Sequence, residues 1–84
     1  MNLESQVDTI RSREDFIVFL RSLSRSLIDF PNDWENANLE DFLNALAAWV
    51  EDMDGYFANR GEPTPQTPDW KLIGQMLLAA RIYE

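Results

Sequence analysis

The chain has 84 residues, 45% of them apolar, and its 15 acidic and 7 basic side chains give a formal net charge of −8. A chain of this size has room for one core, so we expect residues 1–84 to form a single folded domain. Histidine and cysteine are absent, which excludes histidine-based nucleophilic triads, thiolate nucleophiles and the usual zinc sites.

The first two predicted elements are helices. A short helix over residues 3–10 follows from the spacing of Leu3, Val7 and Ile10, and it must dock on the rest of the chain to persist. A long helix starts at Ser12, which can cap it, and stops before Pro31. Its apolar residues recur every three or four positions and predict one buried stripe: Phe16, Phe19, Leu20, Leu23, Leu27 and Phe30, widened by Ile17 and Ile28.

A turn-rich loop over residues 31–37 comes next, and we expect its Trp34 to fold back on the core. Asn38 is a good cap for a second long helix of about five turns. The predicted core side of this helix holds Leu39, Phe42, Leu43, Leu46, Trp49, Val50, Met53 and Phe57. Its polar residues cluster on the opposite face and make the helix amphipathic: Glu40, Asp41, Asn44, Glu51, Asp52 and Asp54.

A Pro- and Gly-containing linker, residues 59–66, precedes the last helix, which we expect to start with Thr67 as cap and Pro68 as its first residue. This helix is apolar around most of its circumference and is predicted to be the most buried. Gly74 is unfavourable in a helix, so it predicts close approach of another helix. Trp49 and Trp70 are predicted core residues. The fold class is therefore all-α, a small bundle of three long helices with a short extra N-terminal helix.

No catalytic, metal or cofactor constellation appears in the sequence, so we expect a protein that is not an enzyme and needs neither a metal nor a cofactor. Asp52-Met53-Asp54-Gly55 matches part of a calcium-binding loop. In that register, however, the first and last ligand positions would fall on Val50 and Gly61, which supply no carboxylate. An acidic helix end is the simpler interpretation.

Nucleic acid and membranes are not expected partners. The basic cluster Arg11, Arg13, Arg21 and Arg25 is offset by nearby acids, which leaves no patch for phosphates; we expect these arginines to form salt bridges to the acidic helix. No apolar run is long enough to span a bilayer. The lack of cysteine and of a signal-peptide pattern favours a cytoplasmic location.

Several motifs resemble those of a family of short bacterial proteins of unknown function, over about residues 14 to 84. They are Trp34-x-Asn36-x-x-Leu39-x-x-Phe42-Leu43-x-Ala45-Leu46-x-Ala48-Trp49, Asp52-Met53, Gly55-Tyr56, Pro68-x-Trp70 and Leu77-Leu78-Ala79-Ala80-x-x-Tyr83-Glu84. The resemblance implies no activity, so these residues carry over as motif positions only. A motif that ends in Tyr83-Glu84 suggests that the end of the chain packs against something.

Between Arg25 and Arg60 the sequence has no basic residue, and its acids there favour a basic protein partner. We therefore expect an interaction module, with an immunity- or antitoxin-like inhibitor as its concrete version. The partner-binding residues would be Glu40, Asp41, Asn44, Glu51, Asp52 and Asp54, with Trp34 and Tyr56 as anchors. The alternative is a structural homodimer, built on Trp34, Tyr56 and the last helix, whose acidic face serves only solubility. An ordinary solvated surface also remains open.

Overall fold

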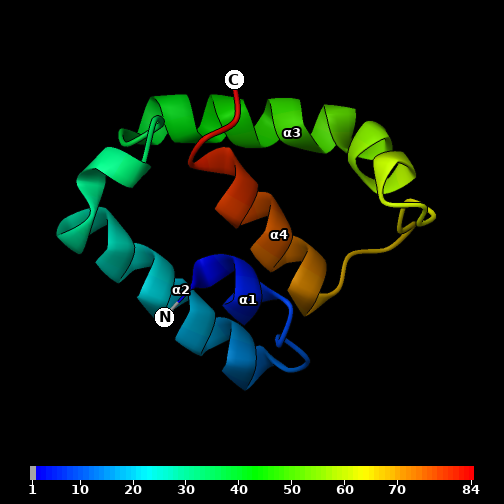
Figure 1. Ribbon diagram of the computed structural model, residues 1–84, viewed down its shortest axis with the longest axis horizontal. Coiled ribbons are helices and arrows are strands. Elements are labelled where there is room, and N and C mark those ends of the chain that lie inside the picture. Colours follow the sequence, from blue (N-terminus) through cyan, green and yellow to red (C-terminus); the bar gives the residue numbers. More distant parts are fainter. Residues whose placement is uncertain (1) are drawn as a thin grey trace.

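The computed structural model describes residues 2–84 and is all-helical over that range, as predicted (Figure 1). In chain order the elements are α1 (Leu3–Val7), α2 (Arg13–Asp29), the short 3₁₀ turn η1 (Pro31–Asp33), α3 (Leu39–Asn59) and α4 (Trp70–Ala80). The three long helices and the short N-terminal one are those expected from the sequence, except that the short helix ends at Val7 and does not extend to residue 10.

Helix α4 is the element on which the others pack. α1, α2 and α3 each lie against it, whereas α2 and α3 do not approach each other closely within residues 2–84. Figure 1 shows the same arrangement, with α4 between α3 on one side and α1 and α2 on the other. In keeping with this place, the segment from Lys71 to Ala80 has no exposed residue, which confirms that the last helix is the most buried.

Polar side chains set where the long helices begin. Ser12 accepts a hydrogen bond from the backbone N–H of Asp15 at 3.1 Å, and Asn38 accepts one from Asp41 at 2.8 Å, so both predicted caps are confirmed. The predicted start of α4 at Pro68 is wrong. Asp69 is the cap, because its carboxylate accepts from the N–H of Leu72 at 2.7 Å, and the helix begins one residue after Asp69.

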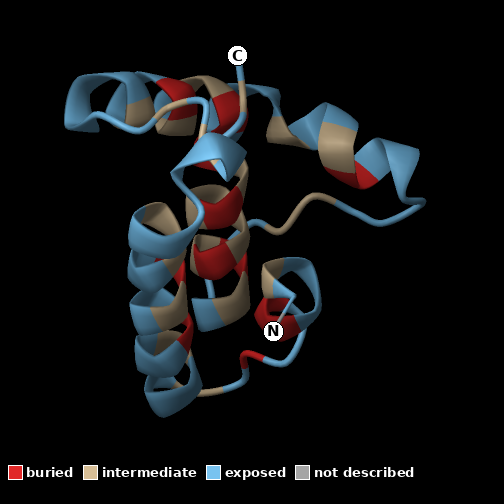
Figure 2. Ribbon diagram, turned by 60° about the vertical axis from the view of Figure 1, so that its left-hand side comes forward, coloured by how far each residue is buried: buried red, intermediate tan, exposed pale blue. Residues whose placement is uncertain are grey.

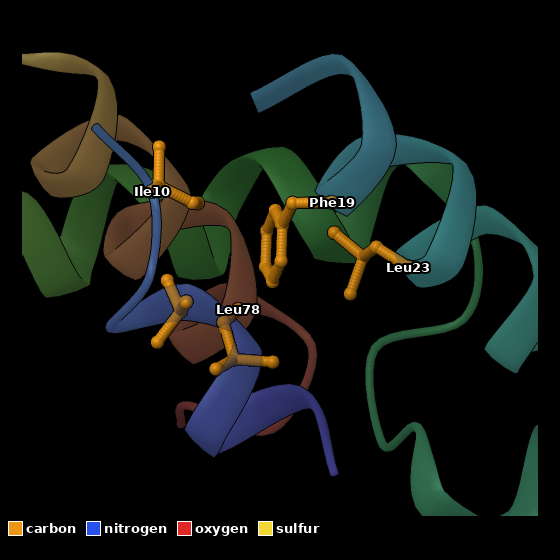
Figure 3. Packing of buried hydrophobic residues seen from close by; sticks show 5 residues of the cluster. Ile10, Phe19, Leu23 and Leu78 are labelled. Atoms are coloured by element: carbon orange, nitrogen blue, oxygen red, sulfur yellow. The ribbon is translucent and has the colours of Figure 1, made fainter. Parts of the chain in front are cut away.

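The core has two parts. In the first, residues from α1, the segment after it, α2 and α4 gather around Phe19, which is completely buried; the cluster is Val7, Ile10, Phe19, Leu23 and Leu78. Figure 3 shows four of these side chains converging between the helices. In the second, Trp49 and Phe57 of α3 meet Leu72 of α4. The short N-terminal helix thus persists because it is docked on the first cluster.

The buried stripes are narrower than the sequence predicts. On α2, Ile17, Leu20 and Ile28 are exposed, as is Phe30 directly after the helix, and on α3 the same holds for Leu39, Leu43 and Val50. The reason is that α2 and α3 do not pack on each other, so each is covered along one side only; Figure 2 shows their outer faces exposed. The prediction that Trp70 is a core residue is also wrong, since it is 41% exposed and meets Phe16 at the edge of α2.

Gly74 marks a close helix contact, as predicted. A Cβ atom at this position would lie 2.8 Å from Cδ1 of Ile10 and 3.2 Å from Cγ2 of Val7. Both distances are shorter than ordinary van der Waals contact. The absence of a side chain on α4 therefore lets α1 and the residues after it lie directly on the helix.

Two glycine substitutions should have opposite effects on stability. Gly55 lies within α3 with open space where a Cβ would be, so Gly55→Ala should raise the free energy of unfolding by about 1 kcal/mol through helix propensity. Gly74→Val should lower it by roughly 1–3 kcal/mol, because the added methyl groups overpack the contact with α1. Denaturant unfolding of both variants measures this. A Gly74→Val protein as stable as the wild type would contradict the close packing of α1.

Candidate partner-binding surface on α3

The predicted polar residues do share the exposed part of one helix. All six are exposed on α3: Glu40, Asp41, Asn44, Glu51, Asp52 and Asp54. The helix is held on its other side by Ala45, Trp49 and Phe57, which are buried. Asn38 positions the first turn, where Glu40 and Asp41 also interact favourably with the positive end of the helix dipole.

No ion pair neutralises the carboxylates of α3 among the described residues. Two of the three arginines of α2 pair within their own helix: Arg25 with Asp29 at 2.9 Å, and Arg13 with Glu14 at 3.9 Å. Arg11 and Arg21 form no ion pair within residues 2–84. The predicted salt bridges from these arginines to the acidic helix are therefore wrong, because α2 and α3 are held apart by α4. The acidic face of α3 is left with no cation from within the described chain.

Two of the six residues have intramolecular hydrogen bonds. The Nδ2 amide of Asn38 donates to Asp41 at 2.8 Å, and the hydroxyl of Tyr83 donates to Asp52 at 2.5 Å. The other four make no side-chain hydrogen bond or ion pair with another residue of 2–84, and we call them the acidic row: Glu40, Asn44, Glu51 and Asp54. Steps of three, four or seven residues place them on one line along the helix.

Trp34 and Tyr56 lie away from the acidic row. Trp34 folds back on the core, as predicted: its indole N–H donates to the hydroxyl of Ser26 at 3.0 Å, and its ring stacks on Phe42. Tyr56 packs against Trp49 on the side of α3 that faces the core, and its hydroxyl accepts from Arg60 at 2.9 Å. Both are half-buried, and both already have intramolecular partners.

Exposed leucine and valine residues beside the acidic row were missed as site residues. Leu39, Leu43 and Val50 follow the length of the helix on the solvent side of its core stripe. The sequence does contain a feature that predicts exposed apolar residues on this helix. The apolar set of this helix covers a wider arc than one packed neighbour can bury.

The loop before α3 holds the end of α4. The side-chain amide of Asn36 donates to the carbonyl oxygens of Ala80 at 2.9 Å and Tyr83 at 2.8 Å. The backbone N–H groups of Glu35 and Asn36 both donate to the carbonyl of Arg81 at 2.9 Å. Carbonyl groups at a helix end need such partners, so this loop fixes the end of the chain beside α3.

Replacing Asn36 should destabilise the protein markedly. Asn36→Ala removes both side-chain donors from part-buried carbonyl groups, and we expect it to lower the free energy of unfolding by about 1–3 kcal/mol. Asn32, an exposed asparagine of η1, gives the matched control, and Asn32→Ala should change stability by less than about 0.5 kcal/mol. Urea unfolding of the two variants measures the difference; equal effects would remove the capping role of Asn36.

The bond between Tyr83 and Asp52 ties the last residues of the chain to α3. The hydrogen bond that Tyr83 donates to the Asp52 carboxylate, helped by partial burial, raises the pKa of the phenol above its ordinary value of 10.0. Only the neutral phenol can donate this bond. Its contribution to stability is therefore complete below the ordinary pKa and is lost as the pH rises through the higher pKa of the folded state.

Alkaline pH should weaken the wild-type protein more than a Tyr83→Phe variant. The variant lacks the bond at every pH, so the stability difference between the two proteins should shrink as the pH rises above about 10. Chemical unfolding at a series of pH values measures this difference. Parallel loss of stability in the two proteins over the whole range would show that the bond does not act as described.

Two hollows of the described surface contain no residue of the acidic row. A groove of about 1010 Å³ lies between α1, α2 and the end of the chain, and a smaller hollow of about 260 Å³ lies between α1, α3 and α4. Within residues 2–84, no three acidic side chains gather as they would to hold a metal ion. No helix in this range is both long enough and apolar enough to cross a membrane.

Fold and surface together define a small helical protein with an acidic face that its described residues leave without a cation. The chain belongs to a family of unknown function, DUF7660, whose match covers residues 12–84. The match begins at the cap of α2, so α1 lies outside it. No curated protein and no solved structure matches the chain. The resemblance to an uncharacterised family is thus confirmed, and it assigns no activity.

Proposed function

We propose that the protein is an interaction module that binds a basic surface of another protein through the acidic face of α3. An inhibitor of the immunity or antitoxin type, which covers a basic protein, is the concrete version. The observation that supports this most is the missing counter-charge. The five carboxylates of α3 have no ion-pair partner among the described residues, although the chain forms five ion pairs elsewhere.

The acidic face also has the physical properties that such binding needs. Its side chains are exposed and stand on a regular helix whose opposite side is core, so the charges keep fixed positions. A surface of one sign speeds encounter with a partner of the opposite sign and discourages partners of the same sign. Nucleic acid and anionic membranes belong to the second group, so we exclude them from the proposal.

A homodimer is the second candidate, and the exposed apolar residues of α3 favour it. Leu39 and Leu43 could pack against a second copy. The last helix, by contrast, offers little free apolar surface, since only Trp70 among its residues is exposed. Against this reading, a symmetric contact through α3 would bring two unneutralised acidic rows together.

Enzymatic activity is not part of the proposal. The acids of α3 are spread along one exposed helix and do not line either hollow, whereas carboxylate-based catalysis needs acids that converge on one substrate. The protein is therefore proposed to act through binding alone.

Charge reversal on α3 tests the proposed function. A basic protein that co-purifies with the chain from its native cells is used as the partner, and its association is followed with wild-type protein and with a Glu40→Lys, Glu51→Lys, Asp54→Lys variant. We expect the variant to associate at least about tenfold more slowly at low salt, with the difference shrinking as salt is added.

A variant of equal charge elsewhere provides the control. Glu14, Asp33 and Glu62 are exposed and lie outside α3, so reversing them together should change association much less than reversal on α3. If both triple variants behave alike, net charge and not the face of α3 governs binding. Recovery of no basic protein would also count against the proposal.

A further inference from the structure

Three exposed apolar residues of α3, together with the half-buried Leu46, form a regular seam. Leu39, Leu43, Leu46 and Val50 are separated by four, three and four residues, which is the spacing of the inward positions of a coiled coil. Met53 and Phe57 continue the same spacing. We call the first four residues the α3 seam.

Among the exposed residues of this line, exposure falls from the start of the helix toward the buried Phe57, and the half-buried Leu46 lies between them. Leu39 is 72% exposed, Leu43 is 51% exposed and Val50 is 38% exposed, whereas Phe57 is 4% exposed. The rest of the chain thus covers the far end of the line and leaves the α3 seam open. The open part spans about three helical turns, or roughly 16 Å.

The acidic row runs directly beside the seam. Glu40, Asn44 and Glu51 each follow a seam residue in sequence, and Asp54 continues their line. On the other flank of the seam are Phe42, which stacks on Trp34, and Trp49, which is buried in the second core cluster. The open seam therefore has negative charge along one edge only, and the other edge is closed by the body of the protein.

This charge pattern favours a basic helix of a partner protein over a second copy of the chain as the occupant of the seam. Antiparallel pairing with a second copy would set the acidic edge of one α3 against the same edge of the other, where like charges repel. The chain carries a net charge of −8, so repulsion between whole copies acts in the same direction. A helix with basic residues beside its apolar ridge meets no such penalty and gains opposite-charge pairs.

We propose that the α3 seam is the docking site for an amphipathic basic helix of a partner protein. This inference rests on the proposed function and makes it specific: the partner contributes a helix of about three turns whose apolar residues repeat with coiled-coil spacing and whose lysines or arginines line one edge. The apolar ridge packs on Leu39, Leu43 and Val50, and the basic edge meets Glu40 and Asp54.

The α3 seam and the acidic row contribute differently to such a complex. Apolar side chains at the centre of an interface, once sealed from water, mainly slow dissociation. Charges at the rim mainly speed association and make it dependent on salt. Substitutions in the seam and in the acidic row should therefore be separable by kinetics as well as by affinity.

Synthetic peptides serve as the probe. The first has three heptads with Leu at both inward positions and Lys at the flanking positions, where like charges discourage it from pairing with itself. The second replaces each Lys by Glu, and the third replaces each Leu by Ser. Binding of the full chain to the immobilised peptides is measured at low and high salt. We expect only the first peptide to bind.

Matched variants then separate the contributions of seam and charge. Leu39→Ala with Leu43→Ala should weaken binding of the first peptide by about tenfold or more at either salt concentration, mostly through faster dissociation. Glu40→Gln with Asp54→Asn should slow association at low salt and have little effect at high salt. Ile28→Ala is the control, because Ile28 is 68% exposed on α2, outside the seam; it should bind like the wild type.

The outcomes distinguish this inference from the proposed function. If the charge variant weakens binding and the leucine variant does not, the acidic face still binds a basic partner but the seam is not the docking site. If neither variant matters, both proposals fall. Equal binding of the Lys and Glu peptides would contradict the inference that the partner helix is basic. A wild-type dimer in sedimentation that becomes monomeric in the leucine variant would assign the seam to a second copy.

Discussion

The structure depends on one helix, α4, that is apolar around most of its circumference. Helix α4 alone touches each of the other α-helices, and α2 and α3 lie on different sides of it without meeting. α3 therefore removes from water mainly the stripe that faces α4, and α2 mainly the stripe that faces α4 and α1. This explains why an apolar fraction of 45% coexists with many exposed leucine, isoleucine and valine side chains. It also explains why Gly74, which lets α1 onto the same helix, sits where it does.

Features that depend on adjacent residues, such as helix caps, can be predicted from this sequence. Which helices pack against each other cannot. Ser12 and Asn38 cap their helices as expected because a cap involves only a few adjacent residues. Periodicity placed the acids of α3 on the solvent side for the same local reason. It could not tell how wide a stripe the fold covers, so Leu39 and Phe30 were assigned to the core. Helix α4 begins after Asp69 and not at Pro68, because the Asp69 carboxylate accepts the hydrogen bond from the N–H of Leu72.

For the candidate surface, the remaining differences come from contacts between distant residues. Whether Arg25 meets the acids of α3 depends on which helices touch, and periodicity within one helix does not contain that information. The partners of Trp34 and Tyr56 are nearer in the chain, since Ser26 is eight positions from Trp34 and Arg60 is four from Tyr56, but apolar periodicity does not predict side-chain hydrogen bonds. The exposed position of the acidic row can therefore be predicted from the sequence. Its lack of an ion-pair partner among the described residues follows only from the way the helices pack.

The bonds of Asn36 also bear on the order in which the chain can fold. They join residues that are 44 and 47 positions apart, and closing so long a loop costs chain entropy before any contact repays it. Helices α1 and α2 contact each other directly, and their residues are close together in the chain. By loop length alone, the contact between α1 and α2 therefore costs less chain entropy to close than the bonds of Asn36, and both cost less than the docking of α1 on the end of α4, where Glu4 and Arg81 are 77 positions apart.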